Sequence, residues 1–92
     1  MREYEMTLTV FGKLYEMSFD LIIEMLREKH GMKITEDGAL LLTVNHEDEL
    51  TQITIEIQSK CYAARPSIVV VSFYEENEEA LSFTFLHSIY GN

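Results

Sequence analysis

The chain has few residues that could cross-link it and no segment that could anchor it. Cysteine and proline each occur once in 92 residues, and tryptophan does not occur. One cysteine excludes a disulfide within the chain and is more typical of a reducing compartment than of secretion. No apolar run approaches the roughly 18 residues of a membrane helix, and the acidic first five residues do not fit a secretory signal. We therefore expect a cytoplasmic protein without a membrane segment.

Basic residues are also scarce. The chain has seven basic and sixteen acidic residues, so its formal net charge is −9. Binding to nucleic acid or to an anionic membrane depends on basic side chains that face phosphates, so the composition argues against both partners. A basic protein surface, a cation or plain solubility remain as explanations of the charge.

The residues that would carry catalysis or bind a metal are few and lie far apart. The histidines His30, His46 and His87 have no ligand-like spacing to one another or to Cys61. The four glycines stand at predicted turns or caps, so no glycine-rich phosphate loop is present. Carboxylates are plentiful, but they lie in charged turns, where nothing would raise a pKa for acid–base work. We expect no enzyme, no metal and no cofactor, and we interpret Cys61 as a buried or incidental thiol.

The first third of the chain has the pattern of a strand followed by a helix. Residues 3–11 alternate, with every second residue apolar: Tyr4, Met6, Leu8 and Val10. Residues 14–17 favour a short second strand, or alternatively an early start of the helix. Apolar residues at helical spacing predict a helix over 19–30, with Ser18 as its N-cap and Gly31 as the left-handed residue after its end.

The rest of the chain has the pattern of strands and turns. The predicted strands are 32–35, 39–45, 50–58, 67–74 and 81–90, with turns at 36–38, 46–49 and 75–79 and a loop over 59–66. The Asp-Gly sequence at 37–38 is a strong hairpin signal. The predicted fold is a single α+β domain, in which one α-helix packs on a mainly antiparallel β-sheet of four to six strands. Its order is β(β)α followed by a β-meander.

The acidic residues gather in two of the predicted turns. Consecutive antiparallel hairpins place alternate connections at the same end of a sheet, so the turns at 46–49 and 75–79 would share one end. That end would hold seven carboxylates: Glu47, Asp48, Glu49, Glu75, Glu76, Glu78 and Glu79. Lys60 and Arg65 would fall at the opposite end. These acids either keep the strand ends solvated or form a surface for a basic partner, and they lack the regular spacing of a calcium loop.

Several predicted strands are apolar on both sides, as at 40–42 and 69–71. A helix of about twelve residues is roughly 18 Å long and is too small to cover both faces of such a sheet. A contiguous apolar patch usually marks an interface. We therefore predict that a second copy or a partner covers the second face or the edge of the last strand, with contacts at Leu41, Val70, Leu86 and Tyr90. The alternative is that sheet twist closes this face on itself, as in a barrel.

A small acidic chain without a catalytic set is typical of a binding module. We expect an inhibitor or adaptor, similar in composition to immunity proteins and phage-encoded inhibitors, that forms a homodimer or a hetero-complex. Its partner would be another protein with a basic surface. A homo-oligomeric structural subunit is the alternative. Less favoured hypotheses are a mimic of nucleic acid and an enzyme with an unrecognised site.

Overall fold

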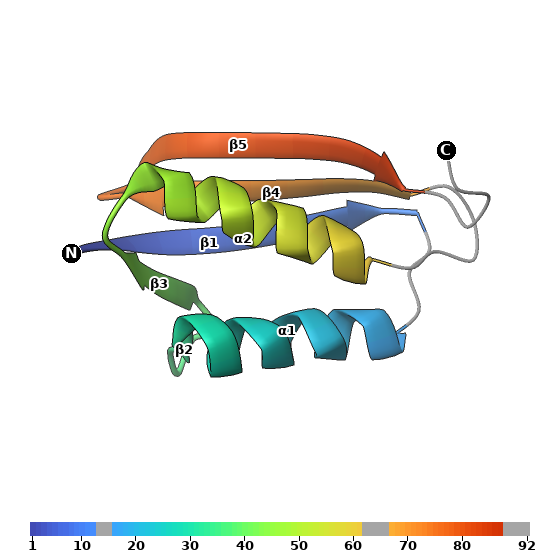
Figure 1. Ribbon diagram of the computed structural model, residues 1–92, viewed down its shortest axis with the longest axis horizontal. Helices are drawn as coiled ribbons and strands as arrows, with labels where there is room; N and C mark the ends of the chain where they lie inside the picture. Colours follow the sequence, from blue (N-terminus) through green and yellow to red (C-terminus); the bar gives the residue numbers. More distant parts are fainter. Residues whose placement is uncertain (13–15, 62–66, 88–92) are drawn as a thin grey trace.

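The structure, a computed structural model, describes residues 1–12, 16–61 and 67–87, except for the side chains of 16–18, 67, 86 and 87. In this part of the chain, two helices pack on one face of a five-stranded antiparallel sheet (Figure 1). The elements are β1 (Arg2–Phe11), α1 (Glu16–His30), β2 (Lys33–Ile34), β3 (Leu40–Val44), α2 (Glu47–Lys60), β4 (Ser67–Glu75) and β5 (Glu78–His87). The strand order is β2-β3-β1-β4-β5, so β1 is central. The predicted α+β class and antiparallel sheet are confirmed.

Residues 47–60 form the helix α2, where the alternation along 50–58 predicted a strand. The segment carries both periods, because Ile53 and Ile57 belong to the strand-like alternation and also to an apolar stripe at helical spacing. The helix buries four of its residues: Leu50, Ile53, Thr54 and Ile57. Ile55 belongs only to the alternation and is 60% exposed. The predicted β-meander was therefore wrong, and the described residues form two helices where one was predicted.

The core lies between the sheet and the two helices. Because strand residues alternate between faces, every second residue of β1, β3 and β4 points toward the helices. The buried apolar residues are Tyr4, Met6, Ile22, Met25, Leu26, Met32, Leu42, Val44, Leu50, Ile53, Ile57, Cys61, Val69, Val71 and Phe73. The alternation predicted for β1 is confirmed, and the second helix supplies cover that one helix could not.

Helix α1 ends where the sequence predicted, but it begins earlier. Gly31 has a φ of 63°, and the chain turns back so that the Met32 N–H donates to the Leu26 carbonyl at 3.1 Å. The helix starts at Glu16, so Ser18 lies inside its first turn and is not the N-cap. The prediction of a second strand at 14–17 fails at residues 16 and 17, which are helical, whereas 13–15 lie outside the described residues.

The predicted hairpin at 36–38 is present between β2 and β3, although β2 has only two residues. Gly38 has a φ of 87°, and the Thr35 N–H donates to the Ala39 carbonyl at 2.9 Å. The Thr35 hydroxyl also donates to the Asp37 carboxylate. That bond, followed by backbone N–H donors, lowers the pKa of Asp37. The turn chemistry of the sequence therefore predicted this connection correctly.

The hairpin between β4 and β5 turns through two residues in the left-handed region. Glu76 and Asn77 have φ values of 52° and 69° and connect the register partners Glu75 and Glu78. Such turns favour asparagine, aspartate or glycine, because other L residues cost about 1 kcal/mol in that region. Asn77 suits its position, whereas Glu76 does not.

We expect the change Glu76→Asn to raise the free energy of unfolding by about 1 kcal/mol, because asparagine tolerates a positive φ. The matched control is Glu76→Gln, which removes the same charge without providing that tolerance. Urea denaturation of the original chain and the two variants measures the difference. Equal stability of the Asn and Gln variants would contradict a conformational cost at this turn.

Candidate functional site

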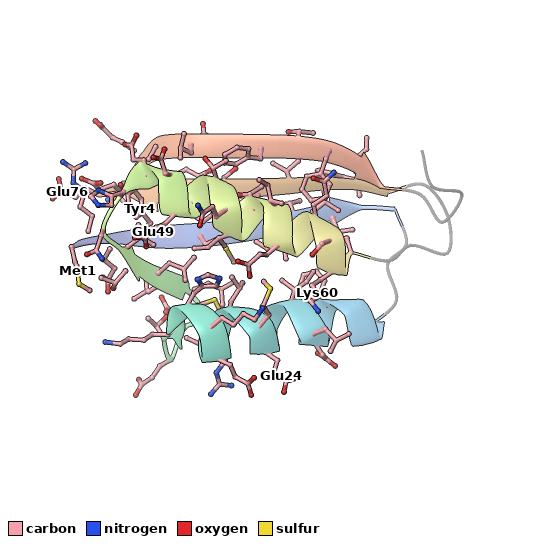
Figure 2. The ribbon with its side chains drawn as sticks, viewed as in Figure 1. Met1, Tyr4, Glu24, Glu49, Lys60 and Glu76 are labelled. Carbon is pink, nitrogen blue, oxygen red and sulfur yellow. The ribbon has the colours of Figure 1, made fainter. Side chains whose placement is uncertain are left out.

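The seven predicted acidic residues lie at one end of the molecule, in two clusters. Glu47, Asp48 and Glu49 form the first turn of α2. The other four surround the β4–β5 turn: Glu75, Glu76, Glu78 and Glu79. Figure 2 shows Glu49 and Glu76 at the same end as Met1. We call these seven residues the acidic end.

Two segments reach this end of the molecule, one at the end of β3 and one at the end of β4, and β1 starts beside both. Arg2 is the register partner of Val44, the last residue of β3, so α2 begins close to the start of β1. On the other side of β1, Glu5 is the register partner of Tyr74, and β4 ends one residue later. The two clusters share an end although a helix replaces the predicted strand, because either element carries the chain across the molecule once. Lys60, at the other end of α2, lies away from it (Figure 2), while Arg65 lies outside the described residues.

Arg2 is the cation that lies between the two clusters. Its Nη1 atom is 3.7 Å from Oε2 of Glu75. The Tyr4 side chain, then the charge of Glu75 and, more weakly, that of Glu47 raise the pKa of the Arg2 guanidinium. The field at Arg2 thus includes one carboxylate from each cluster. Across the residues that the structure describes, Glu75 is the one acid of the seven that forms an ion pair.

The two clusters differ in what they contribute to folding. The carboxylates of the first turn of α2 interact favourably with the positive end of the helix dipole. This support matters because the N-cap His46 makes no side-chain capping hydrogen bond. In the hairpin, by contrast, Glu75 stands directly opposite Glu78, and like charges in that arrangement are destabilising. The hairpin acids therefore repel one another, and the compensation seen among the described residues is a single, largely exposed ion pair between Arg2 and Glu75.

The predicted apolar contact residues do not form one described patch. Leu41 and Val70 are half-buried on the outer face of the sheet, which is turned away from the helices. They are separated by polar residues of β1: Glu5, Thr7 and Thr9. The side chain of Leu86 and the whole of Tyr90 lie outside the described residues.

The middle of the outer face is rich in hydroxyl groups. Its two central rows are Thr7–Ser72–Ser82 and Thr9–Val70–Thr84. The Ser72 and Ser82 hydroxyls are 3.1 Å apart and share a hydrogen bond. At the end of the face opposite the acidic end, Phe11 and Ile68 form an exposed apolar pair. The two faces thus differ clearly, since the core lies on the helix side alone.

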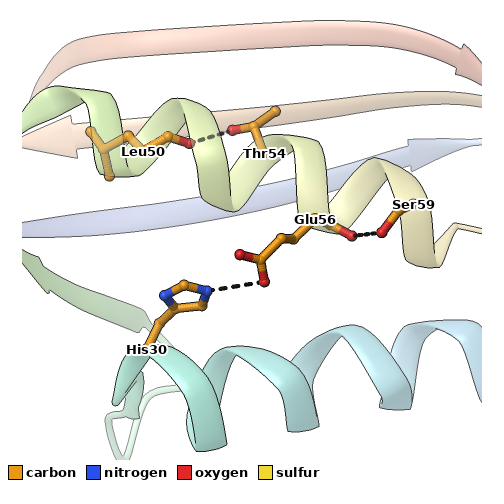
Figure 3. A network of polar contacts seen from close by, with 5 residues as sticks. All are labelled: His30, Leu50, Thr54, Glu56 and Ser59. Carbon is orange, nitrogen blue, oxygen red and sulfur yellow. Dashed lines mark hydrogen bonds and ion pairs between the residues drawn. The ribbon is translucent and has the colours of Figure 1, made fainter.

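A side-chain contact that the sequence did not predict joins α1 and α2 (Figure 3). His30 Nε2 lies 3.2 Å from Glu56 Oε2, with the two side chains 24% and 35% exposed. On the same helix, the Ser59 hydroxyl donates to the Glu56 carbonyl and the Thr54 hydroxyl donates to the Leu50 carbonyl. The two residues of the pair are 26 positions apart, and residues 50–58 were predicted to form a strand, so no sequence signal connected them. The pair joins the two helices across a partly exposed seam.

The described residues offer little for metal binding or nucleophilic chemistry. No group of three or more His, Cys, Asp or Glu side chains among them is arranged to hold a metal ion. Cys61 is buried at the end of α2, and burial raises its pKa to about 11, which disfavours the reactive thiolate. No helix in this part of the chain is both long and apolar enough to cross a membrane. The acidic end is therefore the candidate site. No family model, curated protein or solved structure matches this chain, so only the geometry supports this assignment.

Proposed function

We propose that this chain is a protein-binding module, an inhibitor or adaptor, whose acidic end docks on a basic surface of another protein. The observation that carries the proposal is the meeting of seven carboxylates from two separate segments at one end, with Glu75 alone in an ion pair among the described residues. A one-signed surface of this kind attracts an oppositely charged partner and increases the rate of association.

The hairpin cluster favours binding over plain solvation. Charges that serve only solubility can be spread over a surface, where they repel one another little. Here Glu75 faces Glu78 across the strand pair, and Glu76 occupies a left-handed position that suits it poorly. Proteins tend to keep such local conflicts at functional sites. A mimic of nucleic acid is the less favoured version, because the acids form two clusters rather than a continuous row.

Charge removal in the hairpin tests the proposal. The binding variant replaces Glu76, Glu78 and Glu79 with glutamine, and the control variant makes the same charge change on α1 through Asp20→Asn, Glu24→Gln and Glu28→Gln. All six residues are exposed. Each immobilised protein is used to capture proteins from a lysate of its source cells, which are identified by mass spectrometry. The affinity of each captured protein is then measured in solution with all three chains.

We expect the hairpin variant to bind its partner about tenfold more weakly than the original chain, because three exposed ion pairs are each worth a few tenths of a kcal/mol or more. Added salt should weaken the original complex in the same direction. The control variant should bind like the original chain. Equal binding by the hairpin variant, or an equal loss in the control, would remove the acidic end as the docking surface.

Self-association is a second candidate function, corresponding to the structural subunit considered above. The observation that favours it is the outer edge of β5, with which no other described strand pairs and which lies outside the acidic end for most of its length.

A further inference from the structure

Strand β5 is the last strand of the sheet, and no other described strand covers its second edge. It pairs only with β4 in this part of the chain, from Ser67 opposite His87 to Glu75 opposite Glu78. With ten residues, it is as long as the central strand β1. An uncovered edge presents a row of unpaired backbone N–H and C=O groups, which is a template for another strand.

The two edges of the sheet differ in how they are protected. At the opposite edge, β2 is only two residues long, carries Lys33 and leads into the charged turn with Glu36 and Asp37. Short length and charge are the usual means by which proteins prevent edge pairing. Residues 80–86 of β5, in contrast, contain no charge, no proline and no glycine. The protection that the first edge has is therefore missing from most of the second.

The helix-facing side of β5 is apolar and only partly covered. Leu81, Phe83 and Phe85 pack against the core, yet each remains half-buried. Helix α2 lies beside β5, whereas α1 lies toward the opposite edge of the sheet (Figure 1). More apolar area would leave water if the layer continued past β5.

We propose that a second copy of this chain pairs antiparallel with β5, about a two-fold axis at Phe83. In this register Phe83 lies opposite Phe83 of the second copy, and Leu81 lies opposite its Phe85. On the outer face, Ser82 lies opposite Thr84 of the second copy. Apolar residues thus meet apolar residues and hydroxyls meet hydroxyls, so the pattern is self-complementary, as a two-fold interface requires. A register shifted by one residue places phenylalanine opposite threonine and turns the helices of the two copies to opposite faces.

The same arrangement keeps the like charges of the two copies apart. The acids Glu78 and Glu79 lie at the start of β5, and antiparallel pairing brings the start of one strand beside the end of the other. The two acidic ends are then separated by about 30 Å, the length of a ten-residue strand, which exceeds the Debye length at physiological salt. A net charge of −9 per chain is therefore compatible with this dimer. The proposal does not depend on the acidic end binding a partner.

A pair of double variants tests the register. Ser82→Lys with Thr84→Lys places lysine opposite lysine across the interface, twice. Ser82→Lys with Thr84→Glu places lysine opposite glutamate, twice. Both variants lose the Ser72–Ser82 hydrogen bond, so their difference reports the pairing between copies. The matched control is Thr7→Lys with Thr9→Lys, which puts the same charges on the same face but on the central strand β1.

Analytical ultracentrifugation over the micromolar to millimolar range gives the dissociation constant, and circular dichroism checks that each variant folds. We expect the original chain and the β1 control to sediment at twice the monomer mass. The dissociation constant of the Lys/Lys variant should exceed that of the Lys/Glu variant by about tenfold or more. Hydrogen exchange should slow at β5 amides in the dimer and stay unchanged at β3.

Three results would overturn the proposal. The first is a monomer at every concentration, and the second is equal dissociation constants for the Lys/Lys and Lys/Glu variants. The third is a monomeric β1 control variant, which would assign the interface to the outer face rather than to the edge. If the variants do not fold, hydrogen exchange of the original chain decides, because protection of β5 amides that does not increase with concentration contradicts the pairing.

Discussion

Replacing Ile53 or Ile57 with alanine is expected to lower the free energy of unfolding by about 2 to 4 kcal/mol, because each change leaves a cavity in the core. These two side chains are 1% and 0% exposed, and both face the sheet from α2. Ile55→Ala, in contrast, should change stability by less than about 0.5 kcal/mol, because this side chain is 60% exposed. Alanine is also the better helix former, which offsets part of the apolar burial lost at that position.

Denaturant unfolding of the three variants measures these differences, and the position that matters is Ile55. A strand would place Ile53, Ile55 and Ile57 on one face, so each alanine substitution would then lower the stability of the protein by a similar amount. Three similar losses would therefore contradict the helix and restore the alternation predicted for 50–58. A helix predicts a large loss of stability for Ile53→Ala and Ile57→Ala and almost no change for Ile55→Ala.

The Cys61 thiol is expected to react at least about 100-fold more slowly in the native protein than in the unfolded chain. A thiol with a pKa of about 11 is about 100-fold less ionised near pH 8 than one with the ordinary value of 9.0, and the thiolate is the reactive form. Burial of the sulfur, whose residue is 1% exposed, slows access further. Labelling with a chromogenic disulfide reagent, with and without denaturant, measures the ratio. Fast labelling without denaturant would contradict the burial of this residue.

The same raised pKa predicts how stability depends on pH. Because the thiol loses its proton less readily in the folded chain than in the unfolded chain, ionisation favours unfolding. The contribution of Cys61 to stability is therefore fully present below about pH 9 and is lost as the pH rises toward about 11. The variant Cys61→Ser, which does not ionise in this range, is the control for other groups that titrate there.

The gathering of seven acidic residues at one end could be predicted from the sequence, although α2, the helix that carries three of them, was predicted to be a strand. Glu47, Asp48 and Glu49 were assigned to a turn between strands, and they form the first turn of α2 instead. Their meeting with the β4–β5 turn depends only on one element carrying the chain to the other end and β4 returning it, and a helix or a strand serves equally well as the first element. The His30–Glu56 contact could not be predicted in this way, because it forms only if residues 47–60 are a helix with Glu56 on the side that faces α1.

Some features follow from local chemistry, so the sequence by itself determined them. The alternation of β1, the end of α1 at Gly31 and the hairpins at 36–38 and 76–77 depend on residues close together in the chain, whose backbone preferences and periodicity act wherever the segment lies. The excess of acid in two connections is of the same kind.

Only the tertiary structure decided which of two competing periods residues 47–60 follow and which strand lies at the edge. Ile53 and Ile57 fit both periods. The helix forms because it buries a second apolar stripe against the covered face of the sheet. The strand order, with β1 central and β5 outermost, depends on pairings between distant segments that no local pattern encodes. Burial and pairing act on the whole chain at once, so these features appear only when the elements are packed together.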